Sequence, residues 1–470
     1  MNPSSIAFWG ASNNPMKMGT MQLANILGTG YAGEVYPIHP NESAVMGIPA
    51  FRSIADVGRQ VDLAQLTLPT EVVPGILDEC GRAGIRRAII ISGGFKEAAG
   101  SRGKELEREI LEIAKRHGIR FLGPNCVGVF NSLAGLNSTT IPLPPGGGKI
   151  ALASQSGAYT AMINPFLRSQ GIKMCQTLSL GNEADIDLVD CLEYLKDVPE
   201  VTAIGLYVET VRRPRDFIRA AGETARKKPV VAIYVGGTEA GSRSSLSHTG
   251  ALTGPDGVYE GLFRQAGVIR ASDLDEMLDF LSVLSSQPLP ASGRMAVITN
   301  SGGPGSSLAC HAEKAGLSVP LFSEELTGRL DAVTGPLAYV RNPIDLTFDT
   351  NTNLFKQLAE MIFESPEADG AFIYGIFGGP DFVTNLRKRF PGIEDMRTYM
   401  EEGHVRFCEE LGRLPGEHGK PIVVMSFLGM DSVTVPPLRE RDIPVFPSAS
   451  RSARAMRALL DYRRIRDGHG

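Results

Sequence analysis

The stretch GKIALASQSGA, residues 148–158, decides the fold, because it recurs as GRMAVITNSGG at residues 293–303. Each copy has the pattern of a buried strand followed by a turn rich in serine and glycine. Three further pairs of segments keep the same order along the chain: DIDLVD with NPIDLT, PEVTAIGLYV with PEADGAFIYG, and KKPVVAIYV with GKPIVVMSF. Four collinear matches predict a duplicated α/β domain.

The part of the chain before the duplication alternates short strand-like runs with helical patterns, which is typical of a parallel, doubly wound α/β sheet. The strand-like runs are SIAFWG, EVYPIHP, LAQLTLP, RAIIIS and IRFLGPN. Two segments rich in proline and glycine, IPLPPGGG (141–148) and QPLPASG (287–293), have the composition of linkers. We therefore predict three domains: 1–145, 146–290 and 291–470.

Composition narrows the classes of partner. The 47 basic and 52 acidic residues give a formal net charge of -5, which disfavours nucleic acid and anionic membranes as partners. The six cysteines form no C-x-x-C pair, so we expect neither a disulfide scaffold nor a metal site. The first residues lack the pattern of a signal peptide and no apolar run is long enough to span a bilayer, so we expect neither secretion nor membrane insertion. These features predict a cytoplasmic protein that acts on small molecules. Separately, the basic, helical pattern of residues 451–470 predicts a solvated terminal helix.

Glycine-rich loops are the first candidate sites. The formal G-x-G-x-x-G at 28–33 follows a helical pattern and precedes a strand, so we interpret it as a helix end and turn. The loop GASNNPMKMG (10–19) follows a strand pattern and precedes a helical one, which is the order that a phosphate-binding loop requires. Together with the strand-end loops at 68–71, 92–95 and 123–129, it predicts a cofactor pocket. A purely structural turn remains the alternative. The second strand ends without Asp or Glu, which disfavours an NAD dehydrogenase.

The repeated loops SQSGA (154–158) and NSGGPG (300–305) each end a strand and begin a helix, so their serine hydroxyls and N–H groups suit a phosphate held between two helix N-termini. His248 lies in a long polar loop, and a neutral imidazole is a competent nucleophile toward phosphorus. Glu209, at the end of the strand AIGLYVE, is the carboxylate we expect to fix its second ring nitrogen. An ordinary loop histidine and a solvated carboxylate remain the alternatives.

The ordered motifs GAS…G, YPIHPN, GPNCVG, SQSGA, GNEADID, YVE, TEAG…SHTGAL and NSGGPG…NPIDLT run through nearly the whole chain. Together they resemble the alpha subunit, or alpha-like part, of the ADP-forming acyl-CoA synthetases, relatives of succinyl-CoA synthetase. The resemblance implies a Rossmann-like CoA-binding domain followed by two flavodoxin-like succinyl-CoA ligase domains. It also implies that an acyl-CoA reacts with phosphate to give an acyl phosphate, whose phosphoryl group passes to a histidine and then to ADP.

Site residues follow from the resemblance as well. It implies that His248 carries the phosphoryl group and that Glu209 steadies it. The phosphate would be held by Gln155, Ser156, Gly157, Gly302 and Gly303. CoA would lie along Gly10, Ser12, Lys17, Pro37, Ser92, Gly93, Gly94, Pro124, Asn125 and Cys126.

The resemblance further implies a partner, because no ATP-grasp segment occurs in these 470 residues. We therefore expect a separate beta subunit that binds ADP or ATP with Mg²⁺ in a hetero-oligomer such as α2β2, acting on CoA and a small carboxylic acid. One departure concerns Gly237, where the family often has a basic residue. The alternative function is a CoA-binding regulatory or scaffold protein without ligase turnover.

Overall fold

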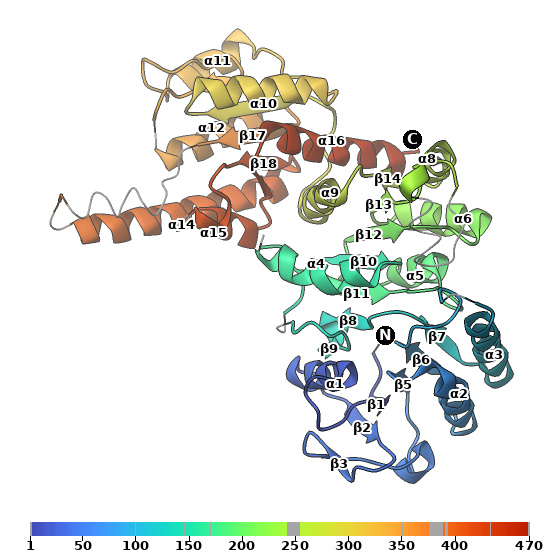
Figure 1. The fold of residues 1–470 in the computed structure, drawn as a ribbon. Coiled ribbons are helices and arrows are strands. Elements are labelled where there is room, and N and C mark those ends of the chain that lie inside the picture. Colours follow the sequence, from blue (N-terminus) through green and yellow to red (C-terminus); the bar gives the residue numbers. More distant parts are fainter. Residues whose placement is uncertain are drawn as a thin grey trace. The chain divides into compact units, whose positions relative to one another are not determined.

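A computed structural model describes residues 2–98, 100–143, 146–169, 171–241, 254–349, 351–375, 389–390, 393–432 and 434–468 (Figure 1). The chain forms two compact units. The first comprises Met1–Arg168 and Lys173–Ser272, and the second comprises Ser169–Ile172 and Asp273–Gly470.

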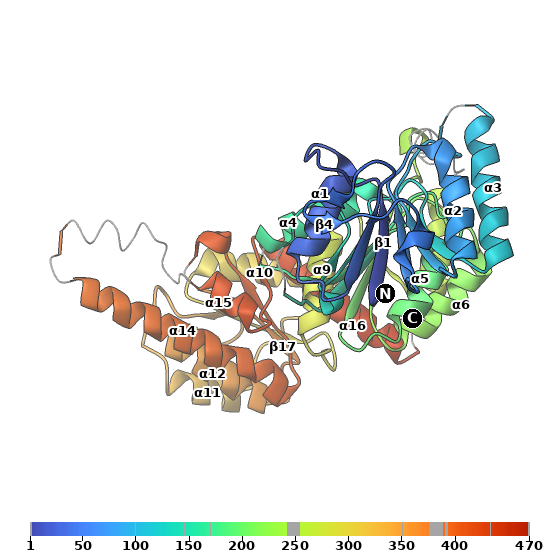
Figure 2. The same ribbon diagram turned by 90° about the horizontal axis from the view of Figure 1, so that it is seen from below.

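The first sheet has five parallel strands in the order β2-β1-β5-β6-β7. They are β1 (Ser5–Trp9), β2 (Glu34–Ile38), β5 (Leu63–Leu66), β6 (Arg87–Ile90) and β7 (Arg120–Leu122). Its helices are α1 (Met18–Gly28), α2 (Val73–Arg82) and α3 (Arg102–His117), of which α2 and α3 lie side by side (Figures 1 and 2). Short elements complete this part: β3 (Ala44–Val45), β4 (Ile48–Pro49), η1 (Ile54–Val57) and η2 (Thr70–Val72).

Strand β1 is buried on both faces, as a central strand between two layers must be. Its side chains alternate with a period of two. Ala7 and Trp9 pack into a core with α2 and α3, whereas Ile6 and Phe8 pack into a second core on the other face. The unbroken apolar run IAFW therefore reflects burial on both faces of the sheet.

The second sheet has seven strands in the order β14-β13-β12-β10-β11-β8-β9. The five from β14 to β11 are parallel, and the antiparallel pair β8-β9 extends the edge at β11. The strands are β8 (Val129–Asn131), β9 (Leu136–Asn137), β10 (Ile150–Ser154), β11 (Met174–Ser179), β12 (Ala203–Val208), β13 (Val230–Tyr234) and β14 (Ile269–Arg270). The helices are η3 (Ser132–Ala134), α4 (Gly157–Ser169), α5 (Leu188–Leu195), α6 (Pro214–Ala225) and α8 (Asp256–Gln265).

The first two sheets share one continuous apolar core. Ile6, Phe8 and Ile89 of the first sheet belong to the same buried cluster as Ala151 and Leu178 of the second. This shared burial explains why both sheets lie in one compact unit.

The second unit contains a five-stranded parallel sheet in the order β16-β15-β17-β18-β19. Its strands are β15 (Met295–Thr299), β16 (Ile344–Asp345), β17 (Gly370–Tyr374), β18 (Ile422–Met425) and β19 (Val445–Phe446). The helices are α9 (Leu274–Ser286), α10 (Gly302–Lys314), α11 (Glu324–Asp331), α12 (Thr352–Glu364), α14 (Ile393–His418), η4 (Gly429–Asp431), α15 (Val435–Glu440) and α16 (Ala449–Arg466).

This third sheet repeats the parallel part of the second strand for strand. The order β11-β10-β12-β13-β14 becomes β16-β15-β17-β18-β19, and the pairs β10/β15, β12/β17 and β13/β18 fall on segments matched in the sequence repeat. Both orders are the 2-1-3-4-5 arrangement of flavodoxin-like folds. The predicted fold class, a Rossmann-like sheet followed by two flavodoxin-like sheets, is confirmed.

The predicted terminal helix forms as α16, but the prediction that it is solvated is wrong. Met456, Leu459 and Leu460 are buried, and the helix packs against α9 and α10 within the second unit. Arg451 pairs with Asp279 of α9 at 2.6 and 2.7 Å. The arginines that suggested a solvated helix instead carry ion pairs at the edge of a buried face.

Candidate functional site

The carboxyl edge of the first sheet holds nearly all the residues predicted to bind CoA. The loop after β1 carries Gly10, Ser12 and Lys17, the loop after β6 carries 92–94, and the turn after β7 carries 124–126. Pro37 differs, because it lies inside β2, buried and paired with Phe8. Ligands of open parallel sheets bind at this edge, so the topology brings the predicted loops to a suitable place.

The loop after β1 is shaped by its own hydrogen bonds. Gly10 has a φ of 97°, and a Cβ there would lie 1.9 Å from the Thr67 carbonyl oxygen, so only glycine fits. The Ser12 hydroxyl accepts a hydrogen bond from the Asn14 N–H at 3.2 Å. The loop leads into α1, whose first turn contains no acidic residue. The first N–H groups of a helix have no partner within it, so this terminus suits an anionic group such as a pyrophosphate.

The loops after β6 and β7 are tied to each other. The Ser92 hydroxyl donates to the Leu68 carbonyl at 2.6 Å, and the Ser92 carbonyl accepts the N–H of Asn125 at 2.8 Å. Asn125 has a φ of 57° and follows a cis Gly123–Pro124 bond. The Cys126 thiol is 4% exposed and donates to the Ile90 carbonyl at 3.3 Å. Burial raises its pKa to about 12, so this turn offers its backbone, not a reactive thiol, to a ligand.

The two repeated serine loops have the same local structure. Ser154 ends β10, and its hydroxyl both donates to the Ser156 carbonyl at 2.8 Å and accepts the Ser156 N–H at 3.1 Å. Thr299 ends β15 and makes the same pair of bonds with Ser301, each at 3.0 Å. Gly157 then begins α4, as Gly302 begins α10, with Gly303 in its first turn. Each loop therefore presents the N-terminus of a helix at the carboxyl edge of its own sheet.

Glu209 directly follows β12 and is 5% exposed. Its backbone N–H donates to Oε1 of Gln155 at 2.5 Å, and the same oxygen accepts the N–H of Thr210 at 3.0 Å. Nε2 of Gln155 donates to the Thr210 carbonyl at 2.8 Å. Sequence analysis selected both Gln155 and Glu209, and the structure brings them together at the carboxyl edge of the second sheet.

His248 lies outside the described residues, but both described ends of its loop are anchored beside β12. On the N-terminal side, the Val235 N–H donates to the Val208 carbonyl at 2.9 Å. On the C-terminal side, the Gly254 carbonyl accepts the Tyr234 hydroxyl at 2.7 Å. Described residues on both sides of this loop are thus bonded to β12, the strand that Glu209 follows, and to its neighbour β13.

The absence of a side chain at Gly237, the predicted departure from the family pattern, has a steric explanation. A Cβ at this position would lie 2.5 Å from Oδ1 and 3.0 Å from Cα of Asp256. The close approach of α8 therefore excludes a side chain here.

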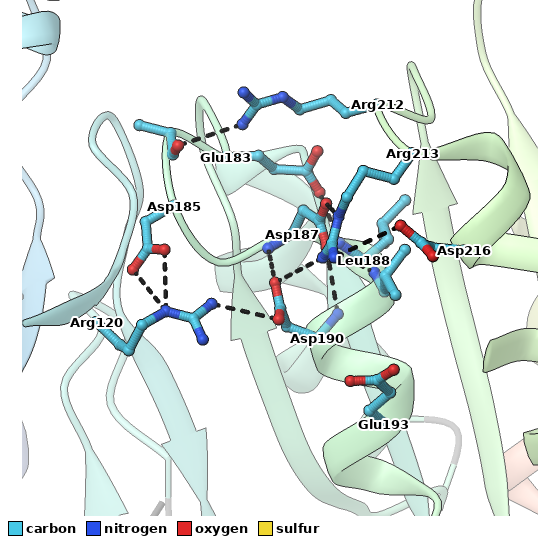
Figure 3. Close-up of polar contacts among 12 residues, drawn as sticks. Arg120, Glu183, Asp185, Asp187, Leu188, Asp190, Glu193, Arg212, Arg213 and Asp216 are labelled. Carbon is cyan, nitrogen blue, oxygen red and sulfur yellow. Dashed lines mark hydrogen bonds and ion pairs between the residues drawn. The ribbon is translucent and has the colours of Figure 1, made fainter. Parts of the chain in front are cut away.

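The segment 181–187 forms an acidic cluster that sequence reasoning did not assign (Figure 3). Asp187 caps α5 by accepting the N–H groups of Val189 and Asp190 at 2.9 and 3.2 Å. Arg213 holds both oxygens of Asp187, at 2.7 and 2.5 Å. Burial alone would raise the pKa of Asp187, but the Arg213 bonds outweigh it and leave the pKa below its usual value. This bidentate pair ties the GNEADID segment to the start of α6, just after Glu209.

Glu183 is the buried member of this cluster, with 2% of its surface exposed and a φ of 51°. One carboxyl oxygen accepts the Leu188 N–H at 3.1 Å (Figure 3). Burial raises its pKa to about 8, against a lowering effect of a hydrogen bond from the Gln155 side chain. The motif GNEADID contained the signal, but nothing in the sequence separates this buried acid from its ion-paired neighbours.

Two further findings concern metals and membranes. Within the described ranges, His, Cys, Asp and Glu side chains form no group of three or more that could hold a metal ion. None of the helices in this part of the chain is long and apolar enough to cross a bilayer.

Family models match two parts of the chain. The CoA binding domain matches residues 4–132, and the succinyl-CoA ligase like flavodoxin domain matches residues 147–284. These ranges contain the first sheet and most of the second.

Whole proteins match as well. The alpha subunit of acetate–CoA ligase [ADP-forming] II of Pyrococcus furiosus is 36% identical over 460 residues, 98% of this chain and 96% of that one. The 4-hydroxybutyrate–CoA ligase [ADP-forming] of Nitrosopumilus maritimus is 34% identical over 78% of this chain and 53% of its own length. A solved acetyl-coenzyme A synthetase 1 of Ca. Korarchaeum cryptofilum, in complex with phosphate and ADP, covers 100% of this chain and 97% of that one at 31% identity and a TM-score of 0.87. The chain therefore belongs to the family of ADP-forming acyl-CoA synthetases and corresponds to their alpha subunit.

Proposed function

We propose that this chain is the subunit of an ADP-forming acyl-CoA synthetase that handles CoA, the acyl group and phosphate. Overall, acyl-CoA, phosphate and ADP interconvert with a carboxylic acid, CoA and ATP. The observation that carries this proposal is the placement of Glu209. It is a buried carboxylate at the carboxyl edge of the second sheet, and described residues on either side of the His248 loop bond to Val208 of its strand and to Tyr234 of the neighbouring strand.

The first step takes place on bound CoA. A phosphate oxygen attacks the thioester carbonyl carbon, the C–S bond breaks, and the CoA sulfur leaves and takes up a proton. We propose that CoA lies along the loops after β1, β6 and β7 and that the starts of α4 and α10 bind phosphate. The residues in these roles are Gly10, Ser12, Lys17, Ser92, Gly93, Gly94, Pro124, Asn125, Ser156, Gly157, Gly302 and Gly303.

The second step uses His248. An unprotonated ring nitrogen attacks the phosphorus of the acyl phosphate, the bond to the acyl oxygen breaks, and the carboxylate leaves. We propose that Glu209 accepts the N–H of the other ring nitrogen and stabilises the positive charge that develops on the ring. A buried carboxylate suits this role, because the attraction between opposite charges is stronger away from water.

The third step needs a nucleotide site. We propose that a separate ATP-grasp beta chain binds ADP with Mg²⁺, and that a β-phosphate oxygen of ADP takes the phosphoryl group from His248. The alpha-subunit name of the full-length relative supports this arrangement. We also propose a cytoplasmic location, consistent with six cysteines that are all free thiols. The names of the matched relatives favour ligase turnover over a purely regulatory CoA-binding role.

The experiment that tests this function combines the chain with its beta partner. Turnover should require acyl-CoA, phosphate and ADP together, and His248→Ala should abolish turnover while CoA still binds. A His248→Ala chain with full turnover would exclude the phosphohistidine route. A screen of carboxylic acids for CoA-thioester formation assigns the acyl group, because the matched relatives bear the names of both acetate and 4-hydroxybutyrate enzymes.

A further inference from the structure

Asn182 follows β11 of the second sheet, but its side chain bonds to segments of the first sheet. The side-chain nitrogen donates to Glu97 at 2.5 Å and to Glu107 at 3.2 Å. The side-chain oxygen accepts the amide N–H of Asn125 at 3.3 Å. These three partners come from the loop after β6, from α3 and from the turn after β7. Because Asn182 is only 3% exposed, water does not compete for these bonds.

The backbone around Asn182 adds two further contacts. Its N–H donates to the Pro124 carbonyl at 2.9 Å, and its own carbonyl accepts the Lys96 ammonium at 2.6 Å. The preceding Gly181 has a φ of 54°, and a Cβ there would lie 2.2 Å from the Pro124 carbonyl oxygen. The segment 181–182 therefore lies too close to the turn after β7 for a side chain at position 181.

Through these bonds Asn182 holds both loops along which CoA is proposed to lie. In the loop after β6, one oxygen of Glu97 accepts the N–H groups of Gly94 at 2.6 Å and Phe95 at 3.2 Å. The other oxygen of Glu97 accepts from Asn182. In the turn after β7, Asn125 bonds to Asn182 directly. A shift of Asn182 would thus move the two loops together.

The segment that carries Asn182 is also bonded to the loop proposed to bind phosphate. Two residues before Asn182, the Leu180 N–H donates to the Ser154 carbonyl at 2.9 Å. The Ser154 hydroxyl in turn bonds to the backbone of Ser156, directly before α4 begins at Gly157. A short series of hydrogen bonds therefore connects the CoA loops to the start of α4.

The duplicated domain shows which of these bonds the fold itself requires. There the Leu346 N–H donates to the Thr299 carbonyl at 2.8 Å, which is the equivalent of the bond to Ser154. This register places Phe348 at the position of Asn182, and Phe348 is 79% exposed. The bond between strand end and loop therefore belongs to the fold. The buried asparagine, in contrast, occurs in the copy that is bonded to the CoA loops.

We propose that Asn182 is a positioning residue for the first step, in which the acyl group passes from CoA to phosphate. The proposal rests on the function given above and adds one residue to it. Asn182 acts through the loops it holds, by setting the distance between the thioester of bound CoA and the phosphate at the start of α4. Such an attack needs the reacting atoms about 3–3.5 Å apart, and a misplacement of about 1 Å can slow it about 100-fold.

The two CoA loops keep bonds to their surroundings that do not involve Asn182. The Ser92 hydroxyl donates to the Leu68 carbonyl, and the Ser92 carbonyl accepts the N–H of Asn125. Loss of the Asn182 side chain should therefore leave the shape of the CoA site, and the affinity for CoA, nearly unchanged. What changes is the position of bound CoA relative to phosphate.

Arsenate isolates the first step from those that follow. An arsenate oxygen attacks the thioester carbon as phosphate does, the CoA sulfur leaves and takes up a proton, and water then cleaves the acyl arsenate to the acid and arsenate. Neither His248 nor ADP takes part. The experiment follows the release of free CoA by the full chain with its beta partner, arsenate and the CoA thioester of the acid selected by the screen above.

For Asn182→Ala we expect kcat of this reaction to fall about 10- to 100-fold. The dissociation constant of CoA should stay within about threefold of the wild-type value, because the loops retain their other bonds. The rate at which ATP and Mg²⁺ phosphorylate His248 should also stay within about threefold, since that transfer does not use CoA.

A second variant and a control complete the experiment. Glu97→Gln keeps the oxygen that accepts from Gly94 and Phe95 but presents an N–H donor to Asn182, so it should slow CoA release in the same selective way. Asn137→Ala is the matched control, because Asn137 is equally buried and its side chain bonds to Thr139 and Ile141 instead of the CoA loops. It should match the wild type in all three measurements.

Three results would overturn the positioning role. One is CoA release by Asn182→Ala at the wild-type rate. Another is a loss of CoA affinity as large as the loss of rate, which would make Asn182 a binding residue. The third is equal slowing of phosphorylation by ATP, which would indicate a general defect. The same criteria apply to Glu97→Gln where Asn182→Ala does not fold. If the wild type itself releases no CoA with arsenate, the proposed function fails instead.

Discussion

The side-chain oxygen of Gln155 accepts the backbone N–H of Glu209 at 2.5 Å, so the residue that follows one strand fixes the residue that follows its neighbour. Strands β10 and β12 are adjacent and parallel, which brings their carboxyl ends together although 54 positions separate the two residues. This bond connects the glycine-rich loop before α4 to the carboxylate expected to hold His248.

Gln155→Ala should therefore destabilise the first unit. It leaves the N–H groups of Glu209 and Thr210 without their acceptor, and each buried donor left unsatisfied costs about 1–3 kcal/mol. Urea denaturation of the full chain measures the loss. Asn300→Ala is the matched control, since that side chain accepts no backbone N–H from the described residues: it donates to the Asp349 carbonyl at 3.1 Å and accepts the Ser301 hydroxyl at 3.4 Å. Equal losses for the two variants would contradict the account.

The stability of the chain should carry a pH dependence from Glu183. In the unfolded chain this acid has its usual pKa of 4.5, whereas in the folded chain the pKa is about 8. Between these values the folded state binds a proton that the unfolded state has released. The free energy of unfolding therefore falls as pH rises, with a limiting slope of about 1.4 kcal/mol per pH unit for this group.

Glu183→Gln removes that titration. Its thermal unfolding midpoint, compared with that of the wild type, should rise more at about pH 7.5 than at about pH 5.5. A difference that stays constant across this range would show that Glu183 is ionised throughout and that burial does not raise its pKa.

Asp187→Ala should lower the free energy of unfolding by about 2 kcal/mol or more, because the variant loses both a helix cap and the partner of a bidentate arginine. Asp216→Ala is the control. Its carboxylate also pairs with Arg213, but at 3.9 Å and with half its side chain exposed, so its loss should cost less than about 0.5 kcal/mol. Chemical denaturation compares the two, and a larger cost for Asp216→Ala would contradict the structure.

Thiol reactivity checks the burial at the turn after β7. Cys310 is the exposed cysteine, whereas Cys80, Cys126, Cys175, Cys191 and Cys408 are buried. A thiol-specific reagent should modify Cys310 rapidly in the native chain, and Cys310→Ser should remove the fast phase. Burial raises the pKa of Cys126 to about 12, so it should react only after unfolding. Fast modification of Cys126 would show that the turn opens its thiol to solvent.

The repeat and the strand pattern predicted most of the fold. Periodic apolar runs placed the strands, and the match of 148–158 with 293–303 predicted two sheets of one topology, which the structure confirms. The false glycine motif was also interpreted correctly: α1 ends at Gly28 and β2 begins at Glu34. Such features depend on neighbours in sequence, and a linear pattern records them directly.

Properties that depend on tertiary packing were less accessible. The arginines of α16 suggested a solvated helix, because their pairing with acids of α9 involves residues more than 170 positions away. Pro37 lies in a strand and not in a loop. The motif GNEADID was visible, but the sequence did not distinguish Glu183 from its ion-paired neighbours, because its burial depends on tertiary packing at a left-handed turn.

The most direct test of the central claim is where phosphate is found on the protein. The full chain, its beta partner, Mg²⁺ and γ-labelled ATP should yield acid-labile, base-stable phosphate on His248, which ADP discharges to ATP and which a carboxylic acid with CoA discharges to free phosphate. Mass spectrometry locates the modified residue. Label on another residue, or full acyl-CoA synthesis by His248→Ala, would contradict the account.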